Sequence, residues 1–190
     1  IEPKGDLIAD VLARVPESRR EDVVLLDPAD DCPVGINPLA GGSPELVADQ
    51  LVSIFAQAYA DSWGPRLSEV LHAGLLTLAR SSHGTLAALP LLLTNGRFRR
   101  RVLAGSDDPF GTGPFWTWFE SLSDEQRQVV VAPVHNKIRP LLVRPALRGV
   151  VGQVQPRFDL GQVFSGRMIV LANLAKGTVG PESARLLGKL

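Results

Sequence analysis

The chain has one cysteine among 190 residues, carries no net charge and contains no long hydrophobic run. A single cysteine cannot form an internal disulfide, which excludes a secreted disulfide-stapled scaffold and favours the cytoplasm as the location. The 20 basic and 20 acidic residues balance, which excludes a uniformly basic nucleic-acid-binding arm. The longest apolar runs, residues 70–79 and 86–93, fall short of the roughly 20 residues that span a bilayer.

The sequence also lacks the motifs of common catalytic and metal sites. It contains no G-x-x-x-x-G-K-[ST] phosphate loop, no G-x-G-x-x-G loop and no G-x-S-x-G nucleophile elbow. His72, His83 and His135 are not spaced as ligands with one another or with Cys32, so no zinc site is expected. We therefore predict no catalytic residue and no metal site, and the pattern assigns the three histidines no chemical role.

Charge is separated along the chain. Residues 1–62 contain 12 acidic and 4 basic residues, a net charge of −8, whereas residues 97–157 contain 5 acidic and 10 basic residues, a net charge of +5. Arginine suits the geometry of phosphate groups, so a dense arginine cluster can contact nucleic acid or an acidic partner. The alternative is the solvated face of a short helix. The densest cluster in this segment comprises Arg97, Arg99, Arg100 and Arg101.

Both ends of the chain have an α/β pattern. Residues 6–14 have apolar positions at helical spacing, and residues 23–26 form the short β-branched and apolar run typical of a buried parallel strand. Near the other end, residues 168–174 indicate a fully buried strand, and Pro181 begins a helix. Asp27, which follows the first strand, suits either a ligand-binding edge or turn chemistry, as do Asp30 and Asp31.

The middle of the chain predicts almost only helices. Helices begin at Pro44 and Pro65, a turn covers residues 81–84, and Ser123 forms a capping box with Gln126. Val130, Val134, Ile138 and Leu142 form the predicted apolar stripe of the last long helix. Prolines 133 and 140 are expected to kink or divide this helix, because each removes a backbone donor.

The predicted fold class is therefore mainly α, with only a few short parallel strands. Residues 43–157 form an all-α domain, inserted at the edge of an α/β core that is represented by two partial segments, residues 1–42 and 158–190.

Several unusual strings support a family resemblance because they occur together and in one order. They are Ile-Glu-Pro-Lys-Gly-Asp-Leu (1–7), Leu-Asp-Pro-Ala-Asp (26–30), Gly-Ile-Asn-Pro-Leu (35–39), Trp-Gly-Pro-Arg (63–66), Pro-Val-His-Asn-Lys (133–137) and Asn-Leu-Ala-Lys-Gly (173–177). Over essentially its whole length, the chain resembles the central part of type IV secretion coupling proteins. These are TraG/TraD-like conjugative DNA-transfer ATPases of the HerA/FtsK-like P-loop class.

The resemblance implies a RecA-like nucleotide-binding core with an all-α domain inserted into it. Such proteins form homo-hexameric rings anchored at the inner face of the cell membrane, and they use ATP and Mg²⁺ to drive DNA or DNA-linked protein toward a secretion channel. Their all-α domain is associated with recognition of DNA, relaxase or accessory proteins. We therefore expect DNA, single-stranded in particular, or one of these proteins as the partner.

The sequence also departs from the family pattern. The Walker A loop would precede Ile1, the Walker B acidic pair would follow Leu190, and Glu2 stands where the family usually has Asp. We therefore expect an excised piece of a larger protein, without ATPase activity or a cofactor of its own, that is a monomer or weak oligomer.

Two groups of site residues follow. Lys4, Gly5 and Asp6, after a core strand, and Lys176 and Gly177, in a strand-to-helix loop of the kind that receives anions, are expected to support nucleotide binding or the ring interface. The residues expected to contact DNA or an acidic partner are Arg97, Arg99, Arg100, Arg101, Lys137 and Arg139.

Two other functions stay open at this stage. The first is a helical protein-interaction module that does not bind DNA; exposure of Trp116 or Trp118 would favour it, and burial of both would remove its best anchor. The second is a fragment of a helicase-like ATPase that acts in DNA processing rather than secretion.

Overall fold

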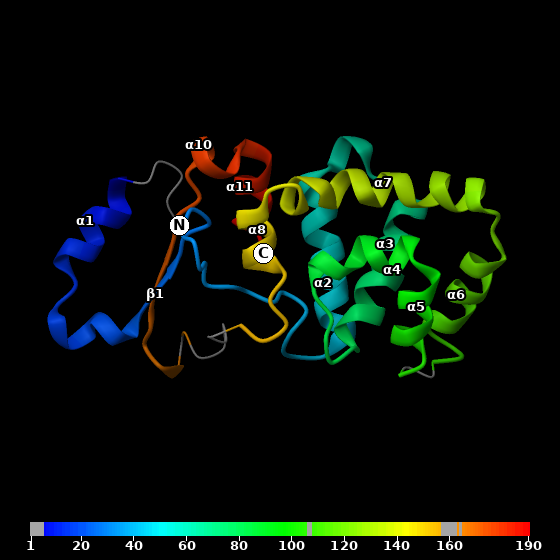
Figure 1. The fold of residues 1–190 in the computed structure, drawn as a ribbon, viewed down its shortest axis with the longest axis horizontal. Helices are drawn as coiled ribbons and strands as arrows, with labels where there is room; N and C mark the ends of the chain where they lie inside the picture. The colour runs from blue at the N-terminus through cyan, green and yellow to red at the C-terminus, as the bar shows by residue number, and fades with distance from the viewer. Residues whose placement is uncertain (1–5, 106–107, 157–162, 164) are drawn as a thin grey trace. The chain divides into compact units, whose positions relative to one another are not determined.

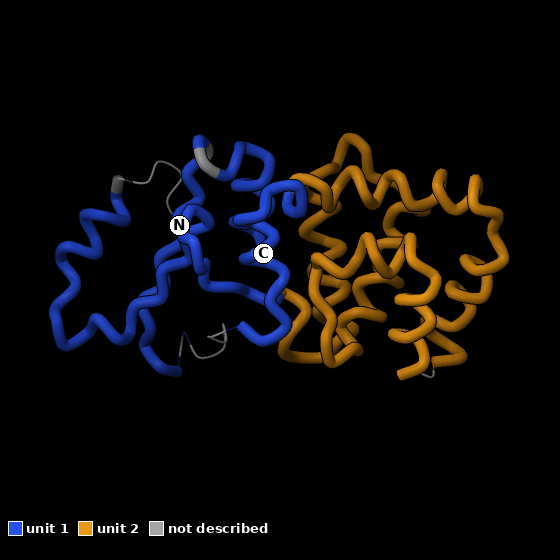
Figure 2. The backbone as a smooth tube through the Cα atoms, in the orientation of Figure 1, with its two compact units in different colours: residues 1–37, 141–190 blue, residues 38–140 orange. Residues whose placement is uncertain are grey.

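The structure is a computed structural model that describes residues 6–105, 108–156, 163 and 165–190 (Figure 1). The chain divides into two compact units, one of residues 1–37 with 141–190 and the other of residues 38–140 (Figure 2). The described residues are mainly helical with two short parallel strands, as predicted. Within these ranges, no helix has both the length and the apolar character needed to cross a membrane.

The two strands of the first unit come from opposite ends of the sequence. β1 (Val23–Leu26) runs parallel to β2 (Ile169–Ala172), with Val23 opposite Ile169 and Leu26 opposite Ala172. β1 has the predicted bounds. All four residues of β2 are only half-buried, so the expectation of a fully buried strand is wrong. The described part of the sheet has two strands, which leaves β2 without the second neighbour that a central strand has.

The helices of the first unit are short. They are α1 (Asp6–Arg14), the 3₁₀ helix η1 (Glu17–Asp22), α8 (Pro145–Val151), α10 (Lys176–Val179) and α11 (Pro181–Leu187). The backbone N–H of Ile36 donates to the carbonyl of Val150 over 2.9 Å. The side chain of Gln153 donates to the carbonyl of Pro33, also over 2.9 Å. These contacts hold α8 with the segment that follows β1, and α8 belongs to the first compact unit, whereas the second comprises residues 38–140.

The second unit is built around α3. Its helices are α2 (Pro44–Ala58), η2 (Ala60–Ser62), α3 (Pro65–Ala79), η3 (Leu86–Ala88), α4 (Leu89–Thr94), α5 (Gly96–Leu103), α6 (Thr112–Ser121) and α7 (Asp124–Leu142). The last two residues of α7 belong to the first unit. α3 contacts α2, α4, α5 and α6. Val70, Leu71, Leu75 and Leu78 on α3 are at most 1% exposed. Burying one such side chain contributes about 1.5–3 kcal/mol, so these four residues of α3 contribute much to the stability of the unit.

The local signals for helix starts are confirmed. α2 begins at Pro44 and α3 at Pro65. The backbone N–H of Ser123 donates to Gln126 Oε1 over 3.0 Å, and the N–H of Gln126 donates to Ser123 Oγ over 3.3 Å, which is the predicted capping box. Ser123 therefore fixes where α7 begins.

α7 is continuous through Pro133 and Pro140, so neither proline divides it into two helices. Its apolar face passes through Val131, Val134 and Ile138, which are at most 3% exposed, whereas Val130 is only half-buried. Packing of this face holds the helix together where Pro133, exposed on the surface, removes one backbone hydrogen bond.

Candidate functional site

The four arginines of α5 divide between the interior and the surface of the helical unit. The Oδ1 atom of Asn95 accepts a hydrogen bond from the backbone N–H of Phe98 over 2.9 Å, which caps α5 and sets where the helix begins. Because the helix begins at residue 96, the position of each later residue along it determines which way its side chain points. Arg99 is 2% exposed, whereas Arg97, Arg100 and Arg101 are exposed.

Arg99 connects three helices inside the unit. Its Nε donates to Glu120 Oε1 on α6 over 2.5 Å, and one Nη donates to the carbonyls of Leu92 and Leu93 on α4 over 2.9 and 3.2 Å. The hydrogen bond from Arg99 is the main cause that lowers the pKa of Glu120. Arg99 is therefore a structural residue, and its predicted role in a DNA-binding surface is corrected: its guanidinium is buried and donates to acceptors of α4 and α6.

The other three α5 arginines have no such partners. None of Arg97, Arg100 and Arg101 makes an ion pair with any residue that the structure describes. Other arginines of the same unit do: Arg66 pairs with Glu69, and Arg127 with Asp124. Within the described part of the chain, the three exposed α5 arginines thus differ from Arg66 and Arg127 in having no ion-paired carboxylate.

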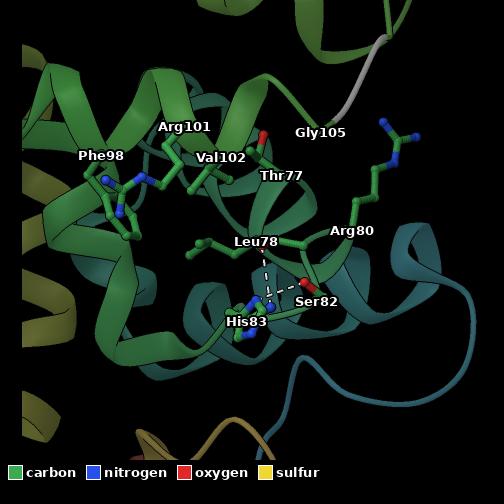
Figure 3. Close-up of a pocket in the computed structure, with 10 residues that line it drawn as sticks. Thr77, Leu78, Arg80, Ser82, His83, Phe98, Arg101, Val102 and Gly105 are labelled. Carbon is green, nitrogen blue, oxygen red and sulfur yellow. Dashed lines mark hydrogen bonds between the residues drawn. The ribbon is translucent and has the colours of Figure 1, made fainter.

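A pocket of about 580 Å³ lies between the end of α3 and α5 (Figure 3). Figure 3 shows Phe98, Arg101 and Val102 on one side, with Ser82 and His83 on the turn across from them. Phe98, Arg101 and Val102 of α5 line it, together with Gly105 just after the helix. The spacing of the three α5 residues puts them on one face of the helix. The remaining lining residues are Thr77, Leu78, Arg80, Ser81, Ser82 and His83.

The turn after α3 forms one wall of this pocket. The N–H of Ser81 donates to the carbonyl of Leu78 over 3.0 Å, and the N–H of Gly84 donates to the carbonyl of Ser81 over 3.1 Å. A Cβ atom on Gly84 would lie 1.8 Å from the carbonyl oxygen of Leu78. Glycine is therefore required there, and the predicted turn over residues 81–84 is confirmed.

Arg80 at the rim of the pocket is already neutralised. It donates to Glu45 over 2.8 Å and to Asp108 over 2.5 Å. The pKa of Asp108 is lowered to about 2 by the backbone N–H of Thr112, by Arg80 and by the backbone N–H of Gly111. The pKa of Glu45 is lowered to about 2 by the hydroxyl of Ser43 and then by Arg80. Arg101 is thus the lining arginine whose charge has no internal carboxylate partner among the described residues.

Lys137 and Arg139 of α7 do not line the pocket. Lys137 Nζ donates to Ser62 Oγ over 2.6 Å and lies 4.8 Å from the centre of the Tyr59 ring. Tyr59 in turn donates its hydroxyl to the carbonyl of Lys137 over 3.0 Å. Lys137 therefore links α7 to the end of α2, whereas Arg139 is exposed.

The expected nucleotide-supporting residues belong to the first unit. Lys4 and Gly5 lie outside the described residues. Asp6 is the first residue of α1, and Lys176 is the first residue of the four-residue helix α10. Gly177, also in α10, is exposed, and a Cβ atom on it would have no neighbour within 4 Å.

The acidic loop after β1 has the hydrogen bonds of turn chemistry. Asp27 accepts a hydrogen bond from the N–H of Ala29 over 2.9 Å, and Asp30 accepts one from the N–H of Cys32 over 3.0 Å. Asp27 also accepts from the side chain of Asn173 over 3.0 Å, across the carboxyl ends of the two strands. Among the residues that the structure describes, no group of three His, Cys, Asp or Glu side chains is placed to hold a metal ion.

The two tryptophans of α6 have different surroundings. Trp116 is 4% exposed, and its Nε1 donates to Thr77 Oγ1 over 2.9 Å in the core. Trp118 is half-buried, with the guanidinium of Arg66 4.6 Å from its ring centre. It lines a second groove, of about 960 Å³, together with Phe110, which is 95% exposed.

The surroundings of the three histidines depend on tertiary contacts that the sequence did not reveal. His72 Nε2 lies 3.1 Å from an Asp49 carboxylate oxygen. Burial lowers the pKa of His135, and its Nε2 has no partner among the described residues. His83 lines the α3–α5 pocket, although the sequence assigned it no chemical role. Its position beside two serines in a turn carried no signal that α5 would lie opposite.

What this site binds has to be inferred from its own geometry. No protein-family model, curated protein or solved structure matches the chain. Among the residues that the structure describes, Arg101 lines the pocket without an ion-pair partner, and Arg97 and Arg100 on the same helix form no ion pair either.

Proposed function

We propose that residues 38–140 form a recognition module that binds the phosphate backbone of nucleic acid through α5. The observation that carries this proposal is the exposure of Arg97, Arg100 and Arg101 without an ion-pair partner in the described chain. The buried Arg99 holds the helix that presents them, so the three charges are displayed from a fixed scaffold. Preorganised cations lose less conformational freedom on binding than cations on a loop.

The number of phosphates that the arginines can contact sets how steeply binding depends on the salt concentration. Each phosphate neutralised on single-stranded DNA contributes about −0.7 to the slope of log K against log salt concentration. Three contacts therefore predict a slope of about −2, so binding should weaken as the salt concentration rises.

The sequence resemblance supports a wider proposal for the parent protein. In it, this chain is part of a cytoplasmic DNA or protein translocase of conjugation or type IV secretion, anchored at the inner face of the membrane. ATP, Mg²⁺, the homo-hexameric ring and contacts with channel components belong to the parent protein. The relaxase and accessory proteins are the alternative partners of the helical unit.

Fluorescence anisotropy with labelled single-stranded and duplex DNA, at about 50 mM and about 200 mM salt, tests the nucleic-acid proposal. The triple variant R97A/R100A/R101A should lose binding at the lower salt concentration. The matched control is R14A/R20A/R148A, which removes three exposed arginines elsewhere and leaves the same net charge. Absence of binding at low salt, or an equal loss of DNA affinity in both triple variants, would refute the proposal.

The half-buried Trp118 favours a second candidate, docking of a partner protein in the groove that it lines with Phe110. An exposed phenylalanine beside a partly accessible tryptophan is typical of an interface anchor. A photo-reactive phenylalanine analogue at position 110 should cross-link to a purified relaxase or accessory protein, and W118A should abolish the adduct. The same analogue at Val129, which is 74% exposed and does not line the groove, is the control. Equal cross-linking at both positions would remove this candidate.

A further inference from the structure

We infer that the α3–α5 pocket receives one unpaired base of a nucleic acid together with its phosphate, which makes the module selective for single strands. This inference rests on the proposed function and names its substrate class. It comes from the arrangement of one pocket and does not follow from the charge of α5 alone.

One wall of the pocket suits the face of a base. Phe98, Val102 and Leu78 line it. Phe98 is half-buried, so part of its ring is accessible from the pocket. Bases stack on such rings without regard to sequence, because every base has a π-face. The pocket volume of about 580 Å³ lies within the range of sites that hold small organic groups.

The phosphate partner stands next to this ring. Arg101 is three residues after Phe98 on the same face of α5, and both line the pocket. Arg80 does not compete for the anion, since Glu45 and Asp108 already accept its hydrogen bonds. A nucleotide with its base on Phe98 thus has its phosphate within reach of Arg101, and Arg97 and Arg100 remain for the neighbouring phosphates.

The opposite wall offers groups for the edge of a base. Ser82 Oγ lies 2.8 Å from His83 Nδ1, and both side chains line the pocket. A hydroxyl both donates and accepts, and a neutral imidazole ring does the same through its two nitrogens. Such groups bind the Watson–Crick edge of a base only when no partner strand occupies it.

A duplex cannot use this pocket without disruption. Its bases are stacked and paired, so one base would have to leave the helix before it could contact Phe98. Duplex DNA is therefore restricted to backbone contacts with the α5 arginines. Because stacking one base on an aromatic side chain changes affinity by about 5- to 150-fold, we expect at least about 10-fold tighter binding of single strands.

The experiment uses the whole chain and an oligothymidine that carries one 2-aminopurine, whose fluorescence falls when the base stacks. Anisotropy gives the affinity, and a duplex of the same length is measured in parallel. F98L keeps the apolar volume and removes the ring. G105F leaves Phe98 and Arg101 intact but fills the pocket from its exposed edge, where a Cβ atom makes only ordinary contacts. R100Q is the control for R101Q, since Arg100 does not line the pocket.

We expect F98L and G105F each to lower single-strand affinity at least about 5-fold, to abolish 2-aminopurine quenching and to leave duplex affinity unchanged. R101Q should weaken single strands more than R100Q does. Equal wild-type affinity for the two DNA forms, or retained quenching in both F98L and G105F, overturns the inference while the proposed function stands. Absence of wild-type binding to either form at low salt overturns the proposed function itself.

Discussion

Buried Arg99 on α5 donates its Nε–H to the carboxylate of Glu120, an exposed residue of α6, over 2.5 Å. The residue that follows it, Arg100, is exposed. Two adjacent arginines of one helix thus have opposite roles: the first holds the scaffold together, and the second is available to a ligand.

Arg99→Ala should lower the free energy of unfolding by about 2–4 kcal/mol, because it leaves buried carbonyl acceptors without a donor and opens a cavity. Arg100→Ala, one residue further along, should stay within about 0.5 kcal/mol of the parent chain. Urea denaturation followed by circular dichroism measures both values. Equal stability of the two variants would contradict the structural role of Arg99.

Gly84→Ala should destabilise the helical unit by about 1–3 kcal/mol, the usual cost of a forced backbone shift. The added Cβ atom would meet the carbonyl oxygen of Leu78 at 1.8 Å, and a backbone atom cannot turn aside as a side chain does. Gly105→Ala is the control, because a Cβ atom there meets only the Val102 carbonyl oxygen at an ordinary 3.7 Å. Thermal unfolding should show a lower Tm for G84A only; a matching fall in G105A would refute the explanation.

Stability should fall in acid as Glu45 and Asp108 take up protons. Folding lowers their pKa values from 4.5 and 3.8 to about 2 in each case. The unfolded chain therefore binds more protons in this range, so the stabilisation is complete above pH 4.5 and is lost as the pH falls toward 2. Urea titrations at a series of pH values should show a shallower decline in D108N. An unchanged slope in D108N would show that Asp108 does not contribute.

Pro133→Ala should stabilise the chain by about 1 kcal/mol or more, because the variant regains a backbone N–H in the middle of α7 and loses the ring that crowds the preceding turn. Pro133 is exposed, so no core contact is removed. Pro44→Ala should give no such gain, since Pro44 occupies the first turn of α2. The Tm values of the two variants are compared with that of the parent chain. A higher Tm in P44A alone would contradict the prediction.

Much of the local structure could be predicted because its causes lie within a few residues. The starts of α2 and α3 depend on Pro44 and Pro65, and the cap of α7 depends on two side chains three positions apart. The strand at Val23–Leu26 is also a local property, since β-branched side chains favour extended backbone. Neighbouring residues alone set these backbone preferences, so they could be predicted from the sequence.

The pocket could not be predicted in the same way. Its walls come from the turn at residues 81–84 and from α5, and nothing local indicates that Phe98 and His83 line the same cavity. The prolines of α7 illustrate the same limit: each lacks a backbone donor, but the helix is continuous through both, with Val134 and Ile138 buried on its apolar face.

By itself, the sequence determined a mainly α chain, its helix starts and a dense arginine cluster in a basic segment. Only the tertiary structure decided which of those arginines could meet a ligand. Arg99 and Arg100 have the same side chain and adjacent positions, and a local pattern assigns them the same role. They differ because one helical step turns a side chain by about 100°, which directs Arg99 toward the carbonyls of α4 and the carboxylate of Glu120, and Arg100 toward solvent.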